Sequence, residues 1–375
     1  MLKYIKYFSP ALIAVLLILT YLQGSFYPTI FLLVFSFIII IGDLFSKDIH
    51  IEKFSYPGIL NFAIYINLPI LFILVFFIIS IFSNSLPSWY IYGFDNFLNI
   101  NFINLKESYT IVDKISIIIN IPIIMGSLGI VAGHELTHRK KDKIDMFIGN
   151  WLLSFSWDCN FAVEHVYGHH KNVCLPEDPA SAKRGENIYL FIFKAIVNEQ
   201  ISGWRIESKR LRRKKNTFIS IHNKMFIGYI RSAFITISAY IFAGTSGMLI
   251  FLLLAILSKS LLESINYIEH YGLVREKGKP VRMRHSWNSN HFFSSVYLYN
   301  VTRHSDHHRN SNLKYWELTP VNKEAPQLPY GYLTLLYLVL FCPFIYKKIM
   351  KKELLNWDKN YANEFERNLV QNILY

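Results

Sequence analysis

The sequence predicts an all-α integral membrane protein with six transmembrane helices and a cytoplasmic histidine-rich cap. Three observations support this prediction. Of the 375 residues, 52% are hydrophobic and only 17% are charged, whereas soluble proteins average about 25% charged residues. Several apolar stretches reach the roughly 20 residues that a helix needs to cross a bilayer. The lysines and arginines are concentrated outside these stretches, so we expect one helical bundle with a polar cap.

Six apolar stretches are the candidate membrane spans. They cover residues 8–24, 27–42, 58–83, 111–134, 225–243 and 247–268. Only the turn-like sequence GSFYP separates the first pair and only AGTSG separates the last pair, so each pair predicts a helical hairpin. A further apolar run near 330–346 contains Pro343, and we expect this segment to be interfacial or re-entrant rather than spanning.

The distribution of cationic residues predicts the orientation, because short flanks rich in lysine and arginine stay in the cytoplasm. Of the 39 lysines and arginines, residues 139–224 hold 16 and residues 271–375 hold 15, whereas residues 84–110 contain only Lys106. Both termini and the cap are therefore expected on the cytoplasmic side of a bacterial inner membrane. We expect one functional domain, with spans one to four in residues 1–134, a cap in 135–224, spans five and six in 225–270, and a cytoplasmic C-terminal region in 271–375.

The net charge of +13 belongs mainly to this cytoplasmic face, which could attract anionic lipid head groups or an acidic protein. The densest basic run, KRLRRKK at 209–215, has no interleaved aromatic residues and precedes a span, so we do not expect it to bind nucleic acid. The three cysteines, Cys159, Cys174 and Cys342, have no CxxC spacing and are expected to be packing residues.

Nine of the 13 histidines fall into four groups near the cytoplasmic ends of the predicted spans. The groups are His134 with His138; His165 with His169 and His170; His270; and His304 with His307 and His308. Spacings of three and four residues place side chains on one face of a helix, so each multi-histidine group can present two imidazoles to one metal ion. Adjacent histidines diverge by about 100° on a helix, and this divergence suits two metal ions better than one.

The first group reads HELTH, which matches the HExxH motif of zinc peptidases. A peptidase zinc needs only three protein ligands and an open position, so nine clustered histidines are too many for it. They could instead supply two metal ions with four or five ligands each, and a nitrogen-rich set suits iron, zinc or copper. A membrane protein that binds metal without catalysis is the alternative in the binding class.

The setting of His270 favours a functional role. Asn266, Glu269 and His270 close an otherwise apolar helix, where ionisable groups are costly unless they have a function. The remaining histidines are isolated in the sequence, and we expect them to be packed or hydrogen-bonded side chains rather than ligands. They are His50, His222, His285 and His291.

The segments HELTHR, EHVYGHH, NYIEHYGL and RHSDHH occur in this order and resemble the histidine boxes of the membrane di-iron alkane hydroxylases. That family is related to xylene monooxygenase and to the membrane fatty acid desaturases. The similarity continues through PEDPASAKRGENIY at 176–189 and EAPQLPYGY at 324–332. The family usually has lysine after its first box, where this chain has Arg139, which is not a ligand position.

The resemblance implies that nine histidines hold two non-haem iron ions and that rubredoxin or a ferredoxin delivers electrons. The implied ligands are His134, His138, His165, His169, His170, His270, His304, His307 and His308. Ligating histidines commonly donate their second ring nitrogen to an acid or a carbonyl. The acids adjacent to them in the sequence, and hence the candidates for such outer contacts, are Glu135, Glu164, Glu269 and Asp306.

The expected activity is oxygen-dependent hydroxylation of the terminal carbon of a hydrophobic substrate, with a linear alkane as the first choice. Such a substrate can enter from the lipid into a pocket lined by Phe, Ile and Leu. A desaturase would use the same metals but remove two hydrogens from an acyl chain, and a xylene-type enzyme would attack an aromatic methyl group. These alternatives stay open at the level of the sequence.

Overall fold

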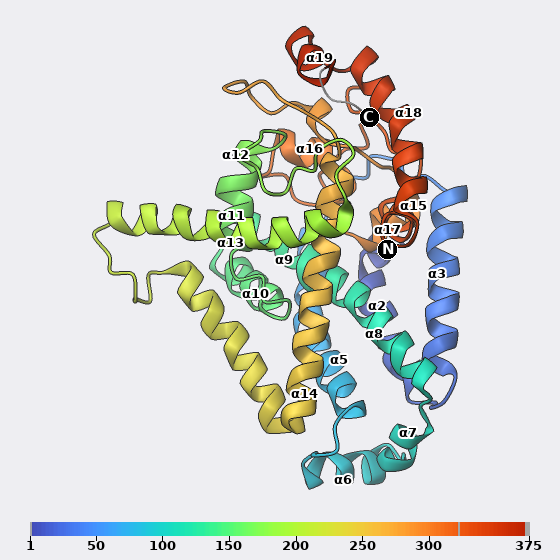
Figure 1. Cartoon of the computed structure of the whole chain (residues 1–375). Coiled ribbons are helices and arrows are strands. Elements are labelled where there is room, and N and C mark those ends of the chain that lie inside the picture. Colours follow the sequence, from blue (N-terminus) through green and yellow to red (C-terminus); the bar gives the residue numbers. More distant parts are fainter. Residues whose placement is uncertain (1, 322, 372–375) are drawn as a thin grey trace.

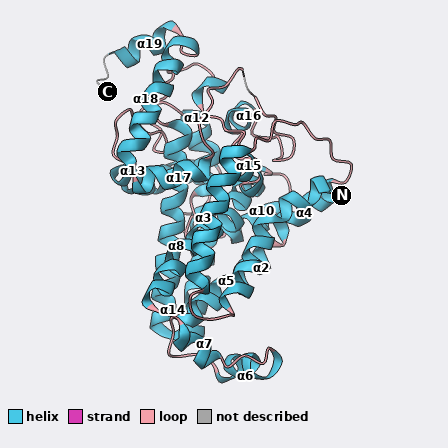
Figure 2. Ribbon diagram, turned by 90° about the vertical axis from the view of Figure 1, so that its right-hand side faces the viewer, coloured by secondary structure: helices cyan, strands magenta, loops and turns pink. Residues whose placement is uncertain are grey.

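The structure is a computed structural model that describes residues 2–321 and 323–371. Within these ranges the secondary structure is helical, and the only β-type pairings are two isolated bridges. The predicted all-α class is therefore confirmed. Figures 1 and 2 show the long helices side by side below a cluster of shorter helices, and α6 and α7 lie at the opposite end.

Ten helices hold about half of the described residues. They are α2 (Ser9–Tyr21), α3 (Tyr27–Phe45), α4 (Pro57–Tyr65), α5 (Asn67–Ile81), α8 (Ile111–Met125), α10 (Lys143–Ser154), α13 (Ile188–Arg213), α14 (Lys224–His270), α17 (Tyr332–Phe341) and α18 (Pro343–Asn360). The other helical elements are α1 (Leu2–Ile5), η1 (Lys6–Phe8), α6 (Ser88–Phe97), α7 (Phe102–Ser108), η2 (Gly126–Val131), α9 (Ala132–His138), α11 (Phe161–Glu164), η3 (His165–His169), α12 (His170–Asn172), η4 (Met283–His285), α15 (Phe292–Tyr297), α16 (His304–Arg309) and α19 (Glu364–Gln371).

In the described ranges, five helical segments are long and apolar enough to cross a membrane. They are Lys3–Tyr21, Tyr27–Phe45, Pro57–Ile81, Ile111–His138 and Lys224–His270. The last segment contains both predicted spans 225–243 and 247–268, and its backbone leaves the helical region at Ala243 and Gly244. Gly244 has φ of +63°, a conformation that glycine adopts without steric cost. Figure 1 shows the two arms of α14 meeting in a V at this point.

The apolar segment near 330–346 is divided into two helices. The 10-residue α17 ends at Phe341, and Pro343 begins α18, whose sequence is rich in lysine. Ten residues give a helix of about 15 Å, which is too short to cross a bilayer core of about 30 Å. That the whole segment does not span the membrane stays a prediction.

The first histidine helix, α9, is held by an unusually close contact with α10. A Cβ atom at Gly133 would lie 3.0 Å from the backbone oxygen of Gly149, and one at Gly149 would lie 3.3 Å from that of Gly133. The two backbones therefore touch where any side chain would separate them. The close contact fixes the position of α9 relative to the rest of the bundle.

A buried ion cluster joins α13 to α14. Lys259 Nζ lies 3.0 Å from Asp158, 2.7 Å from Glu199 and 2.8 Å from Glu263. All four side chains are buried. A single buried cation that faces three carboxylates ties the cap helix α13 to the span that ends in His270, because removing it would leave uncompensated charge in the interior.

Candidate metal centre

All nine histidines of the four sequence groups lie together at one end of the helical bundle. Eight of them are buried, and His170 is partly buried. They come from α9, from η3 and α12, from the last turn of α14 and from α16. The ring nitrogens form two clusters, and within each cluster the atoms lie within 4.8 Å of one another. The five-histidine group is His134, His138, His165, His170 and His307, and the four-histidine group is His169, His270, His304 and His308.

In the five-histidine group, the Nε2 atoms point at one another. The Nε2 atom of His134 lies 3.1 Å from that of His307 and 3.2 Å from that of His138. The Nε2 atom of His170 lies 3.1 Å from that of His165 and 3.2 Å from that of His307. Two nitrogens at about 2.1 Å from one metal ion, as in zinc–histidine sites, are about 3.0 Å apart when their bonds are perpendicular. The observed spacings therefore suit a common ion.

The four-histidine group has the same pattern. The Nε2 atom of His304 lies 3.2 Å from that of His270 and 2.9 Å from that of His308, which in turn lies 3.3 Å from that of His169. Neutral imidazole nitrogens at these distances repel one another through their lone pairs unless a proton or a cation lies between them. The residues present thus fit two metal ions, one in each group.

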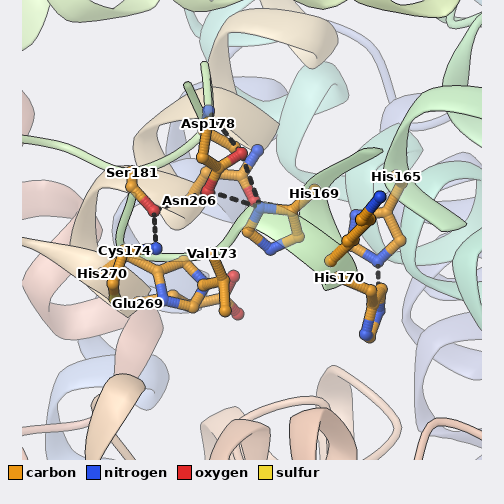
Figure 3. A network of polar contacts seen from close by, with 12 residues as sticks. His165, His169, His170, Val173, Cys174, Asp178, Ser181, Asn266, Glu269 and His270 are labelled. Carbon is orange, nitrogen blue, oxygen red and sulfur yellow. Dashed lines mark hydrogen bonds and ion pairs between the residues drawn. The ribbon is translucent and has the colours of Figure 1, made fainter. Parts of the chain in front are cut away.

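A π-helical turn divides the second histidine group between the two clusters. This finding corrects the expectation that histidines four residues apart face the same metal ion. Residues His165–His169 form the π-helical turn η3, in which hydrogen bonds join residues five apart. His165 consequently pairs with His170, five residues on, as Figure 3 shows, rather than with His169. His169 turns to the four-histidine group instead. In the last box the four-residue spacing holds, since His304 and His308 share one group and His307 belongs to the other.

Burial keeps the cap imidazoles neutral. Desolvation, with further repulsion from neighbouring histidines, lowers the pKa of His165, His170, His304 and His308 well below the ordinary value. The pKa of His307 falls to about 3 for the same reasons. A neutral imidazole has a free lone pair, which is the form that binds a metal ion. At neutral pH these side chains therefore need no deprotonation before they bind.

His169 differs because it has a carboxylate partner that the sequence analysis missed. Its Nδ1 atom lies 3.0 and 3.2 Å from the two carboxylate oxygens of Asp178, and both side chains are buried (Figure 3). Although burial alone would lower it, the pKa of His169 is raised by Asp178. Asp178 lies within the segment 176–189 that carried part of the family resemblance. That resemblance was the available signal, but nothing local connects Asp178 to a histidine nine residues away.

The acids that are adjacent to histidines in the sequence make other contacts. Glu135 binds Arg139 at 2.7 Å, and Asp306 accepts hydrogen bonds from the backbone N–H and the hydroxyl of Thr319, both at 2.8 Å. Glu164 accepts a hydrogen bond from Ser202 at 2.9 Å. Neighbours along a helix point about 100° apart, so adjacency in the sequence does not place an acid behind a histidine ring. Among these four acids, Glu269 differs in that its carboxylate lies 3.3 Å from a ring nitrogen, Nε2 of His304.

An apolar cavity ends at the histidines. Its walls are mainly Ile, Leu and Val side chains from η2, α14 and α17. Its polar end is formed by His134, His165 and His304, and so by members of both groups. Phe161 also lines the cavity, where its ring stacks on His165 at a centroid distance of 4.4 Å and an angle of 13°. An apolar molecule in this cavity would lie directly beside the metal-facing nitrogens.

The four isolated histidines lie outside both groups. His50 and His222 are exposed. His285 Nε2 lies 2.9 Å from Glu366, and His291 Nδ1 lies 2.9 Å from the hydroxyl of Ser289. His285 still serves the centre indirectly, because its backbone oxygen lies 3.0 Å from Nδ1 of His270. The three cysteines are free, and two of them are buried.

Fold and site together define an integral membrane protein with apolar helices and two adjoining histidine groups that could hold metal ions. Residues 115–338 match the family model described as fatty acid desaturase. Because the match covers more than half of the chain, the protein belongs to the fatty acid desaturase family.

The similar curated proteins are monooxygenases. Alkane 1-monooxygenase 2 of Alcanivorax borkumensis is 38% identical over 251 residues, which are 66% of this chain and 65% of the relative. Alkane 1-monooxygenase 1 of Pseudomonas aeruginosa is 38% identical over 231 residues, 60% of each chain. The match to these two thus spans less than two thirds of their length. The xylene/toluene monooxygenase hydroxylase component XylM of Pseudomonas putida is 26% identical over 367 residues, 98% of this chain and 93% of the relative. The predicted resemblance to alkane hydroxylases and xylene monooxygenase is confirmed.

Proposed function

We propose that this protein is a non-haem di-iron monooxygenase that hydroxylates the terminal carbon of a linear alkane to give a 1-alkanol. The balanced reaction takes one alkane, one O2, two electrons and two protons, and it yields the alcohol and one water. The observation that carries the proposal is the apolar cavity, which ends at His134, His165 and His304. A substrate without polar groups has no other means of being positioned than the shape of such a cavity.

The proposed iron ligands are the nine histidines, five for one ion and four for the other. A nitrogen-rich set of imidazoles suits iron and leaves coordination positions open. Bound iron would supply the redox chemistry for activating dioxygen. The chain's own side chains orient the rings: Asp178 holds Nδ1 of His169, and the backbone oxygen of His285 holds Nδ1 of His270.

The cavity walls position the substrate and exclude water. Phe161 covers one face of His165 and meets His134 edge-on at a centroid distance of 5.5 Å. Together with the aliphatic walls it keeps the metal-facing nitrogens out of bulk solvent, which protects a reactive oxidant from side reactions with water. An apolar cavity that ends at the histidines also favours presentation of a chain end rather than of an internal carbon.

We further propose that the protein lies in the inner membrane with both termini in the cytoplasm, and that the two arms of α14 count as separate spans, making six. The metal centre then lies at the cytoplasmic end of α9 and α14, and the substrate enters from the lipid. The basic cap would suit an acidic electron donor such as rubredoxin or ferredoxin.

A xylene-type methyl hydroxylase is the second candidate function. It is favoured by the similarity to XylM, which extends over nearly the whole of both chains. The same cavity could admit an aromatic ring with a methyl group directed at the histidines. Desaturation of a fatty acyl chain, the activity in the name of the matching family, is the third outcome to be tested.

The test is an oxygen-labelling assay on membranes that contain the full-length protein. The membranes receive ferrous iron, NADH, a rubredoxin with its reductase, and a panel of octane, hexadecane, p-xylene and a fatty acyl ester under oxygen-18 gas. We expect a labelled 1-alkanol from the wild-type protein and none from His307→Ala. A labelled benzylic alcohol as the main product would favour the second candidate, and an alkene without alcohol would overturn hydroxylation.

A further inference from the structure

Glu269 has an unusual position in the candidate metal centre. It lies in the last turn of α14 beside His270, is only 2% exposed, and lines the apolar cavity. Its Oε2 atom lies 3.3 Å from Nε2 of His304. Its Oε1 atom is buried and has no hydrogen-bond partner among the described residues. A buried carboxylate oxygen without a partner costs free energy, and such a group in a native fold calls for an explanation such as an ion.

The contact is on the side of the ring that faces the other histidines. The outer contacts of this group are made at Nδ1, by Asp178 with His169 and by the backbone oxygen of His285 with His270. Glu269 instead approaches Nε2 of His304. That same nitrogen faces Nε2 of His270 at 3.2 Å and Nε2 of His308 at 2.9 Å. Glu269 is therefore on the metal-facing side and not behind a ring.

We propose that Glu269 is a carboxylate ligand of the metal ion in the four-histidine group. The proposal rests on the di-iron centre of the proposed function and adds a residue to it. Oxygen and nitrogen ligands at about 2.1 Å from one ion are about 3.0 to 3.4 Å apart at angles of 90° to 109°, and the observed separation of 3.3 Å falls in this range. Because Glu269 contacts His304 alone among the four, its oxygen takes the coordination position beside that histidine, at the end of the cavity.

Two further considerations support this role. With Glu269 the four-histidine group has five protein ligands, the same number as the other group. The imidazole ligands themselves carry no negative charge against two divalent cations, whereas a carboxylate in direct contact offsets part of that buried charge. A hydrogen bond from Nε2 of His304 to Glu269 would instead remove this nitrogen from the set that faces His270 and His308.

The experiment uses the full-length protein in lipid nanodiscs, with Co²⁺ as a spectroscopic substitute for iron. Glu269→Ala and Glu269→Gln are compared with wild type, and Glu164→Gln is the matched control. Glu164 is also buried and adjacent to a histidine in sequence, but its carboxylate accepts a hydrogen bond from Ser202. The measurements are metal bound per chain, metal affinity by chelator competition, the visible spectrum of bound Co²⁺, and the unfolding temperature.

We expect Glu269→Ala to lower the affinity for one of the two bound ions by more than about tenfold, because the loss of an outer contact alone lowers metal affinity by about that factor. The Co²⁺ absorption should increase as that ion loses a ligand, because four-coordinate Co²⁺ absorbs more strongly than five-coordinate Co²⁺. Glu269→Gln should be intermediate, since an amide oxygen is a weaker ligand, and Glu164→Gln should match wild type. Unchanged affinity and an unchanged spectrum in a folded Glu269→Ala protein would overturn the assignment. A wild-type protein that binds no metal would overturn the metal centre itself.

Discussion

Replacing Asp178 by Asn tests whether the buried carboxylate controls metal binding through His169. Asparagine keeps the shape of the side chain but has one acceptor oxygen and no charge. The two carboxylate oxygens lie 3.0 and 3.2 Å from Nδ1 of His169, and both side chains are buried. Hydrogen bonds to charged groups contribute about 1.5–3 kcal/mol and neutral ones about 0.5–1.5 kcal/mol. The substitution should therefore cost about 1 to 1.5 kcal/mol, or roughly tenfold in metal affinity.

The assay is chelator competition for ferrous iron on the full-length protein, with the two ions followed separately. We expect the weaker binding to be confined to one ion, that of the four-histidine group. Asp306→Asn is the control, because Asp306 lies between two histidine positions in the sequence but accepts hydrogen bonds from Thr319. Unchanged affinity for both ions in Asp178→Asn would refute a role of the Asp178–His169 contact in metal binding. An equal loss of iron affinity in Asp306→Asn would refute it as well.

Three further predictions concern the cavity, the buried ions and the C-terminus. Gly126 lines the cavity, and a Cβ atom at this position would meet no atom within 4 Å. Gly126→Leu should therefore fill part of the cavity and shift the products to shorter chains. An unchanged chain-length profile by gas chromatography would contradict this prediction. Lys259→Met should leave three buried carboxylates without their cation and cost about 3–5 kcal/mol of stability. The loss would be measured as a lower yield of folded protein and a lower unfolding temperature. A variant with the wild-type yield and unfolding temperature would show that the ion cluster is not needed for stability. Although burial alone would raise it, hydrogen bonds from His285 and Arg284 lower the pKa of Glu366 from 4.5 to about 2. The contribution of Glu366 to the docking of α19 is therefore present above about pH 4.5 and is lost as the pH falls toward 2. Hydrogen exchange in α19 should accelerate as the pH falls through that window, and Glu366→Gln should remove this pH dependence.

Local patterns in the sequence were sufficient to predict the class of protein and to select the histidines that the structure brings together. Hydropathy over 20-residue windows reports whether a helix can cross a bilayer, and it located the five segments that the structure has as long apolar helices. The turn AGTSG was recognisable because glycine permits the positive φ found at Gly244. Eight of the nine histidines were identifiable because three short clusters of a rare, metal-binding residue type seldom arise together by chance, and His270 was singled out by its polar neighbours at the end of an apolar helix.

The assignment of histidines to two groups required the backbone. His165 and His169 are four apart and would share a face in an α-helix, but the π-turn at this point pairs His165 with His170 instead. Hydrophobic periodicity carries no signal for an inserted π-turn. His307 and His308 are neighbours in the chain and belong to different groups, which the divergence of adjacent helical side chains did predict.

The sequence by itself thus determined the membrane class, the helical content and the set of candidate ligands, because these depend on residue type and on spacing within a few turns. Tertiary structure alone decided which acids serve the centre. Asp178 reaches His169 from a loop beyond the histidine box, whereas Asp306 turns away to Thr319. Glu269 in the last turn of α14 lies 3.3 Å from Nε2 of His304 in α16 because the fold brings these two separate segments together. Contacts of this kind are made between separate segments, and their direction is fixed by packing rather than by position along the chain.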